Sequence, residues 1–110
     1  MESGGGCFPQ VSGIRFTYDL SQPVGNRIAS IEVKSNRGYQ SIDLEAVYKV
    51  AVNSFLSEGN DGYQVFKQAI SSKDLGYMQY DVVTEYITKH SPVNPQLEGR
   101  INGSNLNYGA

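Results

Sequence analysis

The stretch Tyr48–Tyr63 constrains the fold of this chain more than any other. Tyr48–Asn53 is an almost continuous apolar run, which is typical of a central strand covered on both faces. Ser57–Gly62 follows as an acidic loop with two glycines and an asparagine, residues that tolerate a positive φ. Apolar side chains then recur at helical spacing from Tyr63 to Ile70. The stretch predicts a buried strand, a tight loop and a helix of about two or three turns.

Alternating apolar and polar residues upstream predict a β-hairpin. Ile14–Leu20 and Arg27–Lys34 both alternate with the period of a half-buried strand. Ser21–Asn26 lies between them and contains the proline and glycine expected of a turn. Tyr39–Ile42 is expected to add a short strand.

The strongest helical pattern is Asp81–His90. Asp81 stands at its expected N-cap, and Pro92 is expected to stop it. Strands come first and helices later, so the order predicts an α+β fold, a mixed or antiparallel sheet with a few short helices packed on it.

The chain of 110 residues is one domain at most. We expect a flexible Gly/Ser-rich lead-in at 1–7, a folded domain at 8–101 and a disordered tail at 102–110. No signal peptide is visible after Met1, so the chain as given carries no export signal. The chain is interpreted either as a fragment of a longer protein or as a truncated gene product.

Composition argues against several functions. A net charge of -2 and a pI near 5.2 leave no basic surface for nucleic acid. No apolar run approaches the roughly 20 residues that span a bilayer. The single cysteine, Cys7, cannot form an internal disulfide.

Catalytic motifs are missing from the sequence. It contains no HExxH, CxxC, GxGxxG or P-loop pattern. A two-metal hydrolase needs several converging carboxylates and histidines, whereas the one histidine, His90, suits a helix end better than a metal site. We therefore expect no catalytic residue and no metal within these 110 residues, and no activity of the segment alone.

The acidic loop allows more than one interpretation. Glu58, Asn60 and Asp61 offer oxygen ligands, but the spacing of a calcium loop is missing. The residues alone favour Asp61 as the cap of the following helix and Phe55 as a core side chain. A loop between a strand end and a helix is nevertheless a usual place for ligand binding.

Five blocks of the sequence resemble the C-terminal domain of the 5′-nucleotidase family. They are Phe8–Ile14, Tyr18–Ser21, Tyr48–Leu56, Gly59–Tyr63 and Leu97–Ile101. The resemblance covers about residues 8–101, corresponds to the latter part of that domain, and looks closest to the animal ecto-5′-nucleotidases.

The resemblance implies roles for two residues. Phe55 falls on the family's base-stacking phenylalanine, and Asp61 falls on the aspartate that binds the ribose hydroxyls. The family usually has Gly-Gly-Asp where this chain has Gly59, Asn60 and Asp61. Asparagine tolerates the left-handed conformation, so we expect the turn to be kept. The second aromatic and the phosphate-binding residues of the family have no counterpart in these 110 residues.

The resemblance also implies a function. The chain would recognise the nucleoside in a 5′-nucleotidase that hydrolyses nucleoside 5′-monophosphates such as AMP in nucleotide catabolism. The catalytic domain, with a two-metal site of the zinc type, would lie in an N-terminal domain that this chain lacks. The alternative is a noncatalytic fragment that acts as a weak binding or interaction module.

Partners and location follow from the same resemblance. The expected partners are a nucleoside or its monophosphate, the N-terminal domain and a second copy in a homodimer, and the expected location is extracellular or at the cell surface. Asn102, Gly103 and Ser104 form an N-glycosylation sequon. The small residues of the family's lipid-anchor signal are present, but a hydrophobic tail is not.

Overall fold

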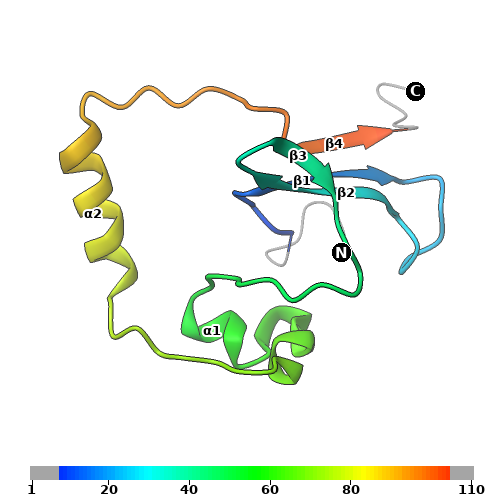
Figure 1. The fold of residues 1–110 in the computed structure, drawn as a ribbon, viewed down its shortest axis with the longest axis horizontal. Coiled ribbons are helices and arrows are strands. Elements are labelled where there is room, and N and C mark those ends of the chain that lie inside the picture. The colour runs from blue at the N-terminus through cyan, green and yellow to red at the C-terminus, as the bar shows by residue number, and fades with distance from the viewer. Residues whose placement is uncertain (1–7, 105–110) are drawn as a thin grey trace. The chain divides into compact units, whose positions relative to one another are not determined.

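The computed structural model describes residues 8–104 and divides the chain into two units. The first, here the sheet unit, comprises residues up to Val47 and from Leu97 onward; the second, here the helical unit, is Tyr48–Gln96. All strands lie in the sheet unit and all helices in the helical unit (Figure 1). The α+β class is confirmed, and the predicted lead-in at 1–7 lies outside the described residues.

One four-stranded sheet forms the sheet unit, in the order β3-β2-β1-β4. Neighbouring strands β1, β2 and β3 pair antiparallel, whereas β4 pairs parallel to β1, so the sheet is mixed. The strand bounds are β1 Ile14–Asp19, β2 Ile28–Ser35, β3 Gly38–Ser41 and β4 Ile101–Ser104. The predicted hairpin and short third strand are confirmed.

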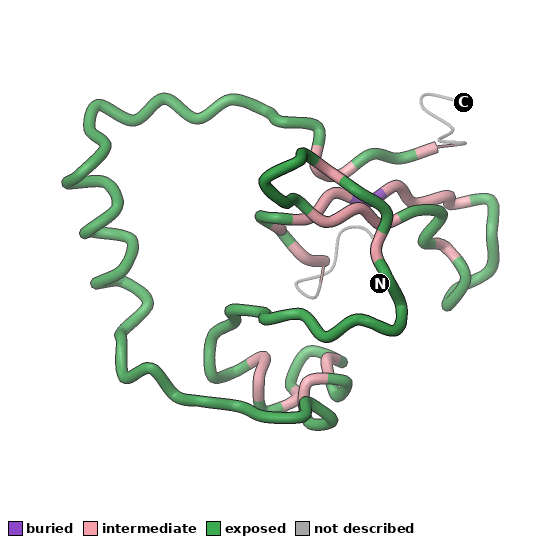
Figure 2. Tube along the Cα trace, viewed as in Figure 1, coloured by how far each residue is buried: buried purple, intermediate pink, exposed green. Residues whose placement is uncertain are grey.

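Aromatic side chains gather on one face of this sheet. Phe16 lies opposite Ile31 in the neighbouring strand, and at 4% exposure it is the one hydrophobic side chain within 8–104 that is fully buried (Figure 2). The ring of Phe8 lies 6.5 Å from that of Phe16 and 6.0 Å from that of Tyr18. These separations suit attractive tilted and edge-on contacts between rings.

An ion pair occupies the other face. Arg15 donates to both carboxylate oxygens of Glu32, from Nε at 2.8 Å and from Nη2 at 3.1 Å. Its guanidinium also lies 4.3 Å from the centre of the Tyr39 ring. The hydrogen bond from Arg15 lowers the pKa of Glu32, and the bond to Glu32 raises the pKa of Arg15.

Strand β4 corrects the predicted tail. Asn102, Gly103 and Ser104 were expected to be disordered, but they pair with Thr17, Tyr18 and Asp19 of β1. The Ser104 hydroxyl also donates to the Tyr18 carbonyl at 3.1 Å. The open edge of β1 supplies backbone partners that composition cannot reveal, which is why the prediction was wrong here. Residues 105–110 lie outside the described part of the chain.

The helical unit holds two α-helices and two 3₁₀-helices. They are α1 Ser54–Ser57, η1 Asn60–Gly62, η2 Gln64–Gln68 and α2 Gln79–His90. The predicted helix from Tyr63 to Ile70 is the five-residue 3₁₀-helix η2. Among the described residues, no helix is long and apolar enough to cross a membrane.

The predicted central strand Tyr48–Asn53 is absent. These residues have no regular structure, and Tyr48, Val50 and Val52 are all exposed. A strand needs a hydrogen-bonded neighbour, and none of the strands described in 8–104 pairs with this run. The apolar pattern was therefore necessary for a central strand but not sufficient.

Helix α2 is confirmed and begins two residues before its predicted start. Met78 is its N-cap and makes no side-chain capping bond. Asp81 lies in the first turn instead, where a negative charge complements the helix dipole. The predicted apolar stripe of α2 is exposed along its length, and its members are Val82, Val83, Tyr86 and Ile87.

Candidate functional site

Phe55 is carried by the short helix α1. The side chain of Asn53 caps that helix, because its Oδ1 accepts the Leu56 N–H at 2.9 Å. Phe55 is 51% exposed, and its ring contacts no other aromatic ring within residues 8–104. The interpretation of Phe55 as a core side chain does not hold in this structure. A half-exposed, unstacked ring is instead available to a planar ligand.

Asp61 adopts a left-handed conformation, with φ 56° and ψ 29°. It is the one residue other than glycine with a positive φ in the described chain. Gly59 and Gly62, at φ 90° and 82°, carry the remaining left-handed turns of the loop. A left-handed residue with a side chain costs on the order of 1 kcal/mol, and such strain is concentrated at functional sites.

The carboxylate of Asp61 is exposed and makes no hydrogen bond or ion pair within 8–104. The expectation that Asp61 caps the next helix is wrong, because η2 has Tyr63 at its N-cap and no side-chain capping bond. The positive φ expected at Asn60 also falls on Asp61 instead. The strained backbone conformation of this turn therefore falls on Asp61, whose carboxylate has no partner within 8–104.

Short backbone bonds close the loop between α1 and η2. The Gly59 N–H donates to the Leu56 carbonyl at 2.9 Å, and the Tyr63 N–H donates to the Asn60 carbonyl at 3.1 Å. The Tyr63 and Phe66 rings stack 5.8 Å apart. Phe55 and Asp61 are therefore held by one compact segment, with Phe55 on its helix and Asp61 in its loop.

Asn60 is a feature that sequence reasoning missed. Its side-chain amide donates to the Phe55 carbonyl at 2.9 Å. A bond from a side chain to a backbone oxygen five residues earlier has no periodic signature. Only the position of Asn60, just past a short helix, could have indicated it, because the last carbonyls of a helix lack partners within the helix.

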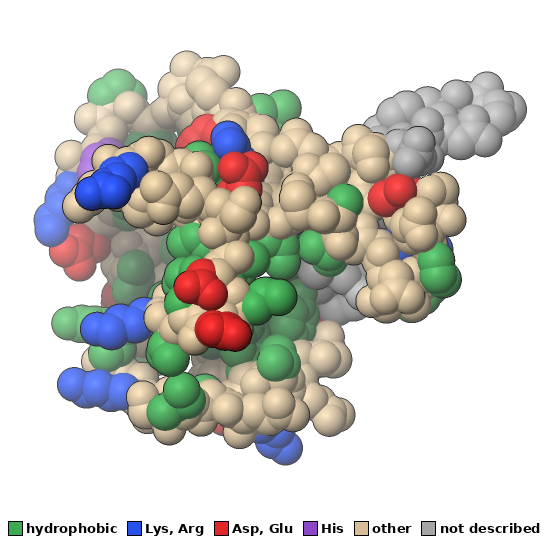
Figure 3. Space-filling view, turned by 45° about the vertical axis from the view of Figure 1, so that its right-hand side comes forward, with side chains coloured by type: hydrophobic (Ala, Val, Ile, Leu, Met, Phe, Trp, Pro, Cys, Tyr) green, Lys and Arg blue, Asp and Glu red, His purple; other side chains and the backbone are tan. Residues whose placement is uncertain are grey.

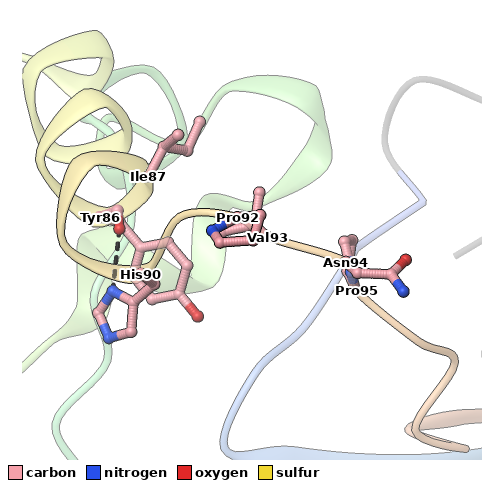
Figure 4. Close-up of a pocket in the computed structure, with 7 residues that line it drawn as sticks. All are labelled: Tyr86, Ile87, His90, Pro92, Val93, Asn94 and Pro95. Atoms are coloured by element: carbon pink, nitrogen blue, oxygen red, sulfur yellow. Dashed lines mark hydrogen bonds between the residues drawn. The ribbon is translucent and has the colours of Figure 1, made fainter.

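A separate open depression lies beside the end of α2 and has a volume of about 340 Å³ (Figure 4). It is lined by Tyr86, Ile87, His90, Pro92, Val93, Asn94 and Pro95. His90 Nδ1 donates to the Tyr86 carbonyl at 2.9 Å, and the two rings stack 4.2 Å apart. These contacts make His90 a helix-end residue, as the sequence suggested.

No metal centre is visible in the part of the chain that the structure describes. Within 8–104, no three His, Cys, Asp or Glu side chains come together as metal ligands. Asn102, the predicted glycosylation site, lies exposed in β4, and its amide donates to the Gly99 carbonyl at 2.7 Å. Its glycosylation stays a prediction.

Comparison with known proteins identifies the family. A sequence profile of the 5′-nucleotidase C-terminal domain matches residues 2–68, more than half of the chain. The chain belongs to the 5′-nucleotidase C-terminal domain family. Its similarity to solved structures agrees with this. The 5′-nucleotidase precursor from Thermus thermophilus matches 89% of the chain with a TM-score of 0.85 and 41% identity.

Curated relatives of this 5′-nucleotidase domain come from bacteria and animals. The trifunctional nucleotide phosphoesterase YfkN of Bacillus subtilis is 42% identical over 92% of the chain. The human 5′-nucleotidase is 37% identical over 87% of the chain. The chain spans only 7% and 17% of these two proteins, and 20% of the Thermus thermophilus chain.

Proposed function

We propose that this domain recognises the nucleoside in a 5′-nucleotidase that hydrolyses nucleoside 5′-monophosphates such as AMP. Phe55 stacks on the base, and Asp61 accepts hydrogen bonds from the ribose hydroxyls. The observation that carries the proposal is the strained and exposed Asp61, which has no partner within residues 8–104, on the same short segment as a half-exposed Phe55.

The chemistry of both groups suits a nucleoside. An aromatic face contributes about 1–3 kcal/mol per stacked base. A carboxylate accepts two hydrogen bonds, and such charge-assisted bonds are stronger than neutral ones. These two contacts must offset the large cost of association, so we expect the 110-residue chain alone to bind AMP with a Kd of about a millimolar or weaker.

Bond cleavage belongs elsewhere in this proposal. The hydrolysis of a phosphate monoester requires charge stabilisation of the kind that two divalent metals provide. We assign that site, of the zinc type, to an N-terminal catalytic domain that acts together with this one. An extracellular or cell-surface location and pairing of two copies are proposed on the family resemblance.

A chimera tests the two site residues. The matching segment of the Thermus thermophilus 5′-nucleotidase is replaced by this chain, and kcat and KM are measured for AMP. We expect Phe55→Ala and Asp61→Ala each to raise KM by about tenfold, since each removes roughly 1–2 kcal/mol of binding. Direct titration of AMP into the 110-residue chain by NMR is the second measurement, with shifts expected around residues 53–63.

Matched controls separate binding from general damage. Tyr77→Ala removes an aromatic side chain that is 76% exposed, and Glu98→Ala removes an exposed carboxylate of the sheet unit. Both controls should keep KM within about twofold of the parent chimera, as is usual for exposed positions. An active chimera whose KM is unchanged by both site substitutions would refute the proposed roles.

A noncatalytic interaction module is the second candidate. The observation in its favour is the exposed apolar stripe of α2, in which Tyr86 is 59% and Ile87 is 44% exposed. Sedimentation of the 110-residue chain and of its Ile87→Asp variant measures self-association and distinguishes this module from a nucleoside-binding domain. Association that Ile87→Asp abolishes, together with no AMP response in NMR, would favour the module.

A further inference from the structure

We infer that Asn60 is a positioning residue of the proposed nucleoside site, an inference that rests on the proposed function. Its side chain links the loop that carries Asp61 to the helix that carries Phe55. The link is the hydrogen bond from Asn60 Nδ2 to the Phe55 carbonyl, at 2.9 Å.

The Phe55 carbonyl needs this donor because α1 is so short. The backbone N–H groups at the end of α1 donate to Asn53, Ser54 and Leu56. In a regular helix the Gly59 N–H would bond to Phe55, but here it bonds to Leu56. These backbone N–H groups therefore leave the Phe55 carbonyl without a backbone donor, and the carbonyl accepts a hydrogen bond from the Asn60 side-chain amide instead.

Asn60 also holds the other side of Asp61. Its own carbonyl accepts the Tyr63 N–H at 3.1 Å. The residue just before Asp61 is therefore tied backward to Phe55 through its side chain and forward to Tyr63 through its backbone. Between these two bonds, Asp61 sits at φ 56°. The two proposed ligand-binding residues are coupled through one asparagine.

The coupling requires an amide at this position. Glycine, which the family usually has here, lacks any side chain and cannot make the bond. Aspartate has the same shape but would set an acceptor against the Phe55 carbonyl. Pre-organising the ring and the carboxylate lowers the ordering cost that binding must overcome. Loss of the amide should therefore weaken binding without altering the groups that touch the nucleoside.

AMP titration of the full 110-residue chain by NMR tests this coupling. We expect Asn60→Ala to raise the Kd about threefold to tenfold, as for loss of one hydrogen bond. Asn60→Asp should have at least the same effect. The control, Asn94→Ala, changes an exposed asparagine beside α2 and should leave the Kd unchanged. In the chimera, Asn60→Ala should raise KM and keep kcat within about twofold.

A double-mutant cycle decides whether Asn60 acts through Phe55. If it does, Asn60→Ala should raise the Kd by a smaller factor in the Phe55→Ala background than in the parent chain, because coupled residues are not additive. Loss of affinity with Phe55→Ala and Asp61→Ala but not with Asn60→Ala, or additive losses in the cycle, would overturn the inference and leave the proposed function standing. If none of the three substitutions alters the Kd, the proposed function falls and the inference falls with it.

Discussion

Gly59 is the loop glycine at which an added side chain would collide with a neighbouring residue. A Cβ added there would lie 2.9 Å from Lys67 Cδ and 3.2 Å from Lys67 Cγ. These atoms belong to the stem of the lysine, so the whole side chain would have to move. Gly62, in the same loop, also has a positive φ, but a Cβ there meets nothing within 4 Å.

This difference predicts that Gly59→Ala destabilises the loop more than Gly62→Ala. Both substitutions place alanine in a left-handed conformation, at a cost of about 1–2 kcal/mol. Only Gly59→Ala adds the clash, and Lys67→Ala should remove the difference. Amide hydrogen exchange at residues 59–63 measures the local opening. Equal exchange in both variants would show that the Lys67 contact has no energetic weight.

Sequence reasoning reached these residues unevenly. Phe55 and Asp61 were selected through the family resemblance, and their roles as ligands stay predictions. The glycines of the loop correctly indicated positive φ values. The bond of Asn60 and the left-handed turn at Asp61 were missed, because both depend on how the first turn after α1 closes in three dimensions.

The contact between Arg15 of β1 and Glu32 of β2 makes the stability of the sheet dependent on pH. The hydrogen bond from Arg15 lowers the pKa of Glu32, so the ionised carboxylate is favoured in the folded state. The arginine stays charged at every ordinary pH. Glu32 should therefore stabilise the sheet above its ordinary pKa of 4.5, and that contribution should be lost as the pH falls through its lower folded pKa.

Glu32→Gln tests this pH dependence. We expect the parent sheet to lose stability more steeply than the variant between about pH 5 and the folded pKa of Glu32, because glutamine does not titrate there. Glu85→Gln is the matched control, since Glu85 pairs with Lys89 on α2 and not with the sheet. NMR signals of β1 and β2 report the loss, and identical pH profiles for the parent and Glu32→Gln would contradict the assignment.

Among the secondary-structure elements, periodicity correctly predicted those whose formation depends on residues close together in the sequence. The hairpin of β1 and β2 and the helix α2 were predictable because alternation and helical spacing can be recognised in short, continuous stretches of sequence. Tyr48–Asn53 was not, because whether an apolar run becomes a strand depends on a distant partner. The part of strand β4 from Asn102 to Ser104 was missed for the same reason, since its partner in β1 lies far away in the sequence.

Hydrophobic side chains are exposed in both units of the molecule (Figure 3). Apart from Phe16, no hydrophobic residue of 8–104 is fully buried. Burial of apolar surface is the main force that stabilises folded domains. We therefore expect the isolated chain to have a small free energy of unfolding.

Dye binding and calorimetry check this expectation. The isolated 110-residue chain should bind a hydrophobic dye at neutral pH and should melt at a lower temperature than the chimera. The chimera in the Thermus thermophilus enzyme should bind less dye, because the longer chain offers surfaces to cover the apolar residues. An isolated chain that melts at the temperature of the chimera and binds no dye would show that its own core is sufficient.

The bond between Ser104 and Tyr18 joins residues that are 86 positions apart. It sits where β4 aligns in parallel with β1, so the last strand of the sheet completes a pairing that the first strand leaves open. During synthesis on the ribosome, β1, β2 and β3 can pair long before β4 has emerged. The edge of β1 that pairs with β4 therefore stays unpaired until the whole helical unit has been synthesised. Contacts between residues so far apart in the sequence also form slowly.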